Sequence, residues 1–103
     1  MKRRGESVGR VETEILGEKA ATLGRAGERL EAALAELEAL ARALASVPDG
    51  DARRDALRAA YRAARERART ARLHLCIQRE AVGLRSHRVV DQQFPEPAPP
   101  PWL

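Results

Sequence analysis

Apolar residues recur at a fixed interval through the first half of the chain. Leucine occupies every seventh position, at Leu16, Leu23, Leu30, Leu37 and Leu44. Side chains three, four and seven positions apart share one face of a helix, so this ladder is typical of a helix that packs lengthwise against another helix. Leu34 and Leu40 widen the apolar face. The pattern predicts one helix over about residues 8–45.

The periodic pattern stops at residues 46–51, which read Ser-Val-Pro-Asp-Gly-Asp. Proline is unfavourable inside a helix and glycine accepts backbone angles that other residues resist, so this segment predicts a turn. Asp49 or Asp51 can accept hydrogen bonds from the free amide groups that open a following helix. A second helix is therefore expected over about residues 52–83, with Gly83 suited to the left-handed position just past its end.

Two helices of nearly equal length joined by a short loop predict an antiparallel hairpin that spans residues 1–84. One face of the second helix is expected to pack on the first helix; this face comprises Leu57, Tyr61, Ala64, Ala68, Ala71, Leu75 and Val82. Leu73, Ile77 and Leu84 project to the opposite side. The end of the second helix is thus apolar on two faces, and one antiparallel partner covers only one of them.

The second apolar surface needs a cover, which is either another copy of the chain or the chain's own tail. The residues expected at this dimer or tail contact are Val11, Ile15, Leu73, Ile77 and Leu84. A lone pair of helices buries little area against the conformational entropy that folding removes. We therefore favour a homodimer in which two hairpins form a four-helix bundle, with the twofold symmetry common among dimers. The fold class predicted is all-α.

The composition changes at residues 85–103, which we expect to form an extended, proline-rich tail. Five prolines among its last ten residues disfavour a helix and favour an extended polyproline conformation. Phe94 and Trp102, two of the three aromatic residues of the chain, also lie there. Three alternatives follow: the tail packs along the helices with these two rings in grooves, it is disordered, or it docks into an aromatic groove of another protein.

The chain carries 19 basic and 15 acidic residues, a formal net charge of +4, and 17 of the basic residues are arginine. On the second helix, arginines form a stripe beside the apolar face, and its candidate anion-binding members are Arg58, Arg62, Arg65, Arg69 and Arg72. The stripe is either a solvated rim paired with glutamates of the first helix or a contact to the phosphates of a nucleic acid. The sequence shows no helix-turn-helix pattern and few stacking aromatics beside these arginines, which favours the rim.

If the stripe is a solvated rim, its expected partners are four glutamates of the first helix: Glu28, Glu31, Glu36 and Glu38.

A separate group of polar residues follows the apolar end of the second helix. Its members, Gln78, Arg79, Glu80, Arg85 and His87, are expected to form a polar network between this end and the tail.

Residues with catalytic or metal-binding potential are few. His74 and Cys76 lie two positions apart on a helix, so their side chains diverge and cannot share a metal ion. The sequence contains neither the Glu-x-x-His pattern of di-iron bundles nor a phosphate-binding loop, a nucleophile elbow or a dinucleotide fingerprint. We expect no catalytic, cofactor-binding or metal-binding residues, and hence no enzyme and no cofactor.

Two stretches carry a resemblance to known sequences. Residues 14–27 read Glu-Ile-Leu-Gly-Glu-Lys-Ala-Ala-Thr-Leu-Gly-Arg-Ala-Gly, and residues 77–87 read Ile-Gln-Arg-Glu-Ala-Val-Gly-Leu-Arg-Ser-His. They resemble small bacterial helical proteins classed as domains of unknown function. The resemblance implies a bacterial, cytoplasmic, helical protein and implies no chemistry.

Other features agree with a cytoplasmic location. A single cysteine excludes an intrachain disulfide, and no apolar stretch of secretory type follows the basic start Met1–Arg4. No segment approaches the roughly 20 apolar residues that cross a bilayer. We expect a non-enzymatic interaction or scaffold protein that acts as a homodimer. The alternatives are a basic nucleic-acid-associated protein that uses the arginine stripe, and a small adaptor or chaperone with a docking tail.

Overall fold

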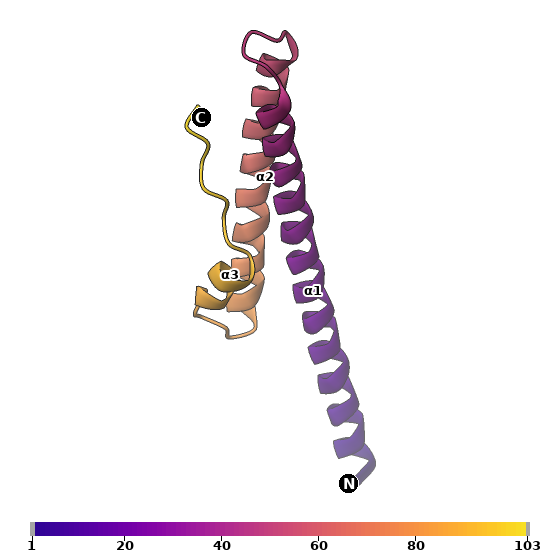
Figure 1. The fold of residues 1–103 in the computed structure, drawn as a ribbon. Coiled ribbons are helices and arrows are strands. Elements are labelled where there is room, and N and C mark those ends of the chain that lie inside the picture. Colours follow the sequence, from indigo (N-terminus) through magenta and orange to yellow (C-terminus); the bar gives the residue numbers. More distant parts are fainter. Residues whose placement is uncertain (1, 103) are drawn as a thin grey trace.

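The computed structural model describes the backbone of residues 2–102 and the side chains of residues 9–102. Its elements are three helices, α1 (Lys2–Ser46), α2 (Arg53–Ala81) and α3 (Arg88–Gln93). The all-α prediction is confirmed for this part of the chain. Figure 1 shows α1 and α2 side by side and running in opposite directions, with α3 beside the end of α2 and the following residues returning along α2.

The two long helices differ in length, which corrects the prediction that they would nearly match. α1 begins at Lys2 rather than near residue 8 and has 45 residues, whereas α2 has 29. At 1.5 Å per residue these lengths are about 67 and 43 Å. No proline lies before Pro48, so the residues before residue 8 contain no strong helix breaker and continue α1. The first part of α1 therefore continues past the end of α2 (Figure 1).

The connection between α1 and α2 is fixed by hydrogen bonds of the predicted turn residues. Gly50 adopts a φ of +84°, in the left-handed region that favours glycine. The Asp51 carboxylate accepts a hydrogen bond from the backbone N–H of Arg53 at 2.8 Å. Asp49 instead lies 3.5 Å from the guanidinium of Arg54. Of the two aspartates considered from the sequence, Asp51 is the one that satisfies a free amide at the start of α2.

Gly83 occupies the position after α2 that the sequence predicted. Its φ is +88°, its N–H donates to the carbonyl of Glu80 at 3.0 Å, and the N–H of Leu84 donates to the carbonyl of Arg79 at 2.9 Å. This pair of bonds is the Schellman arrangement that closes a helix. The chain turns sharply here, which lets α3 and the following residues return along α2.

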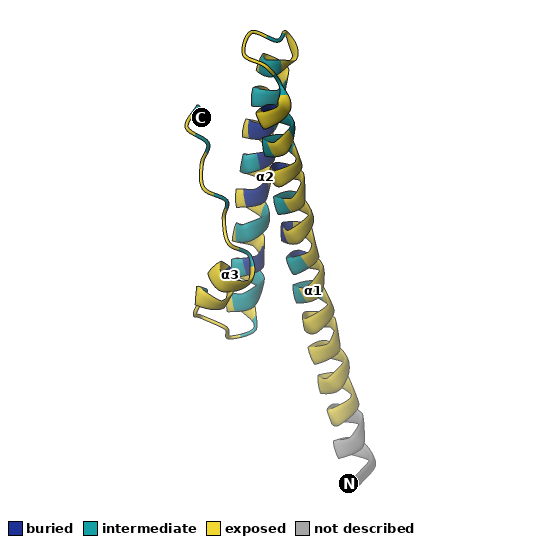
Figure 2. Cartoon of the chain, viewed as in Figure 1, coloured by how far each residue is buried: buried dark blue, intermediate teal, exposed yellow. Residues whose placement is uncertain are grey.

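The core lies between α1 and α2 and has two apolar clusters. One is formed by Ala26, Leu30, Leu75 and Val90, with Leu23, Leu34, Ala71 and Phe94 packed against it. The other is formed by Leu37, Leu44, Tyr61 and Ala64, with Leu40, Ala41, Leu57 and Trp102 packed against it. Figure 2 shows these buried positions on the facing sides of the two helices. Each cluster includes residues from beyond α2, so the tail belongs to the core.

The predicted extended tail contains one short helix that the sequence pattern did not indicate. α3 covers residues 88–93, with Val90 buried at 1% exposure in the first cluster. The N–H of Phe94 closes the helix by donating to the carbonyl of Val90 at 2.8 Å. Burial of Val90 stabilises a single helical turn that would not persist in isolation. The prediction of an extended conformation is therefore wrong for residues 88–93.

Candidate functional site

The tail is anchored at its far end by Trp102. Its ring meets the ring of Tyr61 edge to face, with centroids 5.1 Å apart and planes inclined by 71°. Tyr61 is only 2% exposed and packs with Leu37 and Leu44. Trp102 thus covers the second core cluster from outside, and of the three alternatives for the tail the structure has packing along the helices.

The near end of the extended segment is anchored by Phe94. Its ring packs against the first core cluster, and its Cζ atom lies 3.9 Å from the point where Gly27 would carry a Cβ. Gly27 belongs to α1, whereas Leu75 in the same cluster belongs to α2. Phe94 therefore contacts both long helices. We call the surface that receives residues 88–102 the tail groove; the residues that contact the tail there include Gly27, Arg58, Tyr61, Arg69 and Arg72.

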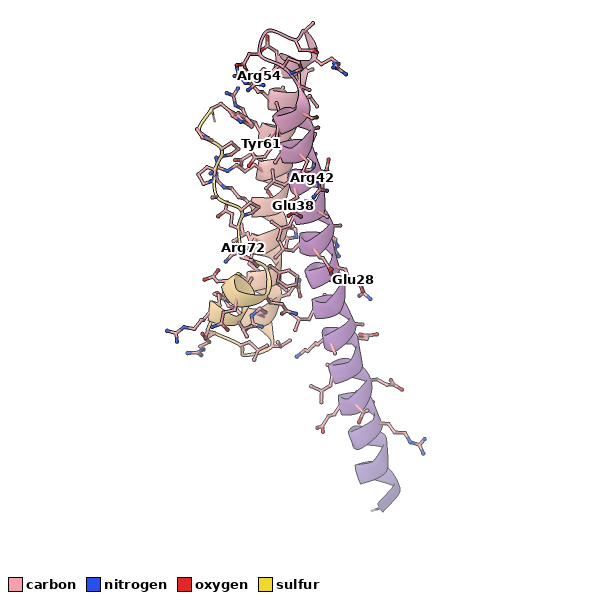
Figure 3. The ribbon with its side chains drawn as sticks, viewed as in Figure 1. Glu28, Glu38, Arg42, Arg54, Tyr61 and Arg72 are labelled. Atoms are coloured by element: carbon pink, nitrogen blue, oxygen red, sulfur yellow. The ribbon has the colours of Figure 1, made fainter. Side chains whose placement is uncertain are left out.

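Three arginines of the predicted stripe contact the tail. The Arg58 guanidinium lies over the Trp102 ring, 5.9 Å from its centroid, a cation–π geometry. The Arg72 guanidinium forms an ion pair with Asp91 and donates a hydrogen bond to the Phe94 carbonyl at 3.4 Å. Nε of Arg69 lies 3.6 Å from the Glu96 carboxylate. Figure 3 shows Arg72 and Tyr61 on the side of α2 that faces the tail.

The prediction that the stripe pairs with glutamates of the first helix is wrong. Among residues 9–102, only one of the four predicted glutamates pairs with an arginine: Glu36 with Arg67 at 2.6 Å, and Arg67 lies outside the stripe. Arg62 is exposed and Arg65 is half-buried, and neither makes an ion pair within the same residues. The sequence reasoning missed the partners because it compared the stripe with the first helix alone. Asp91 and Glu96 are the only acidic residues of the tail, and their presence could have indicated that the tail pairs with the stripe.

The polar network predicted between α2 and the tail forms in part. Nε2 of His87 lies 2.8 Å from the Glu80 carboxylate, and the Arg79 guanidinium donates to the carbonyl of Ser86 at 2.8 Å. These contacts hold the loop between α2 and α3 against the end of α2. Within the described residues, the structure does not bring the Gln78 and Arg85 side chains into this network.

The apolar residues predicted at a dimer or tail contact stay uncovered. Val11, Ile15, Leu73, Ile77 and Leu84 are 43–59% exposed with the tail packed in place, so the tail does not cover them. Leu16 and Val89, which the sequence reasoning did not include, are also exposed. Within residues 9–102, no part of the chain covers these side chains.

Candidate chemistry elsewhere is sparse. A shallow groove of about 370 Å³ lies between α1 and α2, lined by Ala26, Arg29, Glu66, Arg67, Thr70, Ala71 and His74. His74 is exposed and Cys76 is half-buried. Within the described part of the chain, no three His, Cys, Asp or Glu side chains gather as a metal site requires. The tail groove therefore has the most extensive set of specific contacts outside the helix pair.

Comparisons with models of protein families, with curated proteins and with solved structures found no match for this chain. The resemblance to small bacterial helical proteins thus stays a prediction. None of the helices in the described residues has both the length and the apolar character that crossing a membrane demands.

Proposed function

We propose that the protein is a non-enzymatic helical interaction or scaffold protein of the bacterial cytoplasm that acts as a homodimer. The observation that carries the proposal is the exposure of Val11, Ile15, Leu73, Ile77 and Leu84 after the chain's own tail has packed. Exposed apolar side chains near the same end of the helix pair favour a protein partner, because covering them removes apolar area from water.

The difference in helix length supports a partner at this end of the molecule. α2 ends against α1 beside Leu16, Lys19 and Ala20, where a crevice lies between the helices. The part of α1 before Leu16 extends roughly 20 Å further at 1.5 Å per residue. A single helix of this length is marginal in water without tertiary contacts. A second helix lying along it would supply them.

Charge favours a second copy as that partner. Residues 11–18 contain three glutamates and no basic residue, whereas residues 69–88 contain five arginines and one glutamate. In a twofold dimer with the open ends facing each other, the start of α1 from each copy lies along the outer face of α2 in the other. Val11 and Ile15 then cover Leu73 and Ile77, and the opposite charges flank them. The four helices meet as a four-helix bundle.

Sedimentation equilibrium of the whole protein tests the proposal. We expect a dimer at micromolar concentration for the wild-type protein and a monomer for Val11→Glu and for Ile77→Glu, since each places a carboxylate in the apolar contact. Ala59→Glu is the matched control, because Ala59 is exposed on α2 and lies about 21 Å along the helix from Leu73 at 1.5 Å per residue. Circular dichroism shows whether the helices persist. A wild-type protein that stays monomeric throughout the concentration range overturns the proposal.

Nucleic-acid association has less support, since the tail engages three of the five candidate anion-binding arginines. Arg62 and Arg65 are the stripe members left for phosphates. Salt-dependent retention of the protein on duplex DNA, lost in the Arg62→Glu, Arg65→Glu double variant, is the result that would favour this alternative.

A further inference from the structure

Residues 94–102 lie on the helix pair in the manner of a bound peptide. Residues 95–100 have no helix and no strand and run along α2 (Figure 1), the segment carries five prolines, and its two aromatic side chains contact the core at Phe94 and Trp102. Prolines donate no backbone hydrogen bond, so such a segment docks through its side chains and carbonyl groups. Residues of the tail groove contact both the side chains and a carbonyl group of this segment.

We propose that the tail groove is a peptide-binding site whose ligands are extended, proline-rich, acidic segments of partner proteins with two aromatic anchors, and that the chain's own tail is a built-in competitor for it. This inference is independent of the proposed homodimer, because the exposed surface of Val11 and Ile77 is separate from the groove.

The groove recognises three features of its ligand. Tyr61, with the core cluster to which it belongs, receives one aromatic side chain, and the surface beside Gly27 receives the other. The two anchors are eight positions apart, which is about 25 Å in a polyproline helix. Between them, Arg69 pairs with a carboxylate. The selected pattern is therefore an aromatic residue, an acidic residue close behind it, prolines, and a second aromatic residue.

Arginine contributes to this selection in two further ways. Arg58 lies over the second aromatic ring, and a guanidinium in this position favours tryptophan over an aliphatic side chain. Arg72 donates a hydrogen bond to the carbonyl of Phe94, the first aromatic residue. It also pairs with the carboxylate of Asp91, three positions earlier. All three arginines are on α2, so they remain in place when the tail leaves.

The tail is held weakly enough to exchange. Phe94 and Trp102 are only half-buried, and the side chains of Arg69 and Glu96 are each about half exposed. Ion pairs at such exposure contribute less than about 1 kcal/mol each. A departing tail removes Trp102 from the Tyr61 ring, which is 2% exposed with the tail in place. An empty groove is therefore apolar and favours replacement of the tail by another segment.

The tail also leaves part of the groove unfilled. A hollow of about 520 Å³ lies between α1 and the tail, lined on the α1 side by Glu31, Leu34, Ala35 and Glu38 and on the tail side by Gln93 to Pro97. A partner segment with larger side chains at the positions of Pro95 and Pro97 would contact Leu34 more fully.

Tethering explains why the tail nevertheless occupies the site. A segment joined through a short loop competes at an effective concentration of the order of millimolar. A free peptide with the same contacts therefore enters only when it binds more tightly or when the tail is weakened. Trp102→Ala in the whole chain weakens the tail and leaves every residue of the groove unchanged.

Fluorescence anisotropy with a labelled peptide of residues 88–102 is the test. We expect the Trp102→Ala protein to bind this peptide at least tenfold more tightly than the wild-type protein does. A control peptide with alanine at the positions of Phe94 and Trp102 should not bind. A Glu96→Arg protein, which weakens the tail without removing an aromatic anchor, repeats the test should Trp102→Ala lose its helical circular dichroism.

A charge exchange separates recognition from a general effect on folding. Arg69→Glu in the Trp102→Ala protein should weaken binding of the peptide, and a peptide carrying Glu96→Arg should restore it. The inference is overturned if the well-folded variants bind no peptide, or if binding ignores the charge exchange. The inference is also overturned if the wild-type protein is a dimer and the Trp102→Ala protein is a monomer. In that case the tail of one copy binds the other copy.

Discussion

Trp102 contacts Tyr61 edge to face, with ring centroids 5.1 Å apart, although the two residues are separated by most of α2, by α3 and by the proline-rich segment. Tyr61 is the one aromatic residue of the helix pair, and Trp102 packs against the core cluster to which it belongs. This contact ties the last described residue of the tail to the core, and it makes the tail part of the stability of the helix pair.

Replacement of Trp102 by alanine should therefore lower the free energy of unfolding. The edge-to-face contact and the half-buried apolar area together are worth about 1 to 3 kcal/mol. Urea unfolding followed by circular dichroism measures the change. Pro99→Ala is the control, since Pro99 is exposed and should change the free energy by less than about 0.5 kcal/mol. Equal effects of the two substitutions would contradict a structural role for the tryptophan.

The leucine ladder should divide into members of unequal importance. Leu30 is 1% exposed in the first core cluster, whereas Leu16 is 65% exposed on the part of α1 that passes the end of α2. Leu30→Ala should cost about 2 to 5 kcal/mol of unfolding free energy, because it leaves a cavity. Leu16→Ala should change the stability of the isolated monomer by less than about 0.5 kcal/mol. Urea titrations at low protein concentration compare the two.

Two glycines should respond in opposite directions to alanine. A Cβ at Gly24 meets nothing within 4 Å, so Gly24→Ala should stabilise α1 by about 1 kcal/mol through helix propensity. Gly83 has a φ of +88°, where an alanine side chain is strained, so Gly83→Ala should destabilise the end of α2. Thermal unfolding midpoints measure both. A rise in the midpoint for Gly83→Ala would contradict the assigned helix end.

The start of α2 should show a pH dependence due to Asp51. The side-chain hydrogen bond from Arg53 lowers the pKa of Asp51 from 3.8 to about 2, and the backbone N–H of Arg53 adds to this effect. Because the folded-state pKa is below that of the unfolded chain, the ionised carboxylate stabilises the fold above pH 4. This contribution is lost as the pH falls through about 2.

Asp51→Asn removes this titration, so its thermal midpoint should lie below that of the wild-type protein at pH 6 and approach it at pH 2. Asp49→Asn is the matched control, because Asp49 is almost fully exposed and its distance to Arg54 is longer. A difference between wild type and Asp51→Asn that stays constant from pH 6 to pH 2 would rule out the proposed role of the carboxylate.

The helix pair was predictable because its signals are local. The ladder from Leu23 to Leu44 set the face of α1 that meets α2, and Pro48 with Gly50 marked the turn. Gly83 marked the end of α2 and adopts the positive φ that its position requires. In each case a neighbouring stretch of a few residues contained the physical reason for the structure.

The features that escaped prediction depend on contacts between distant parts of the chain. The helical turn of α3 depends on burial of Val90 against Leu30 and Leu75, and a pattern within residues 85–103 cannot reveal that neighbour. The arginine stripe was read against the first helix, whereas Arg69 and Arg72 contact acidic residues of the tail. The seven-residue periodicity also could not show that α1 extends past the end of α2, because the leucine ladder continues to Leu16, which is exposed.

The long, thin outline of this molecule affects how its association state has to be measured. Its radius of gyration is 19.9 Å and its extents are 76 × 22 × 15 Å. A compact domain of the same length has a radius of gyration of roughly 13 Å. A single chain therefore elutes from a sizing column ahead of globular standards of equal weight, and elution volume alone would mistake it for a larger species. Light scattering or sedimentation equilibrium, which report mass directly, avoids that error.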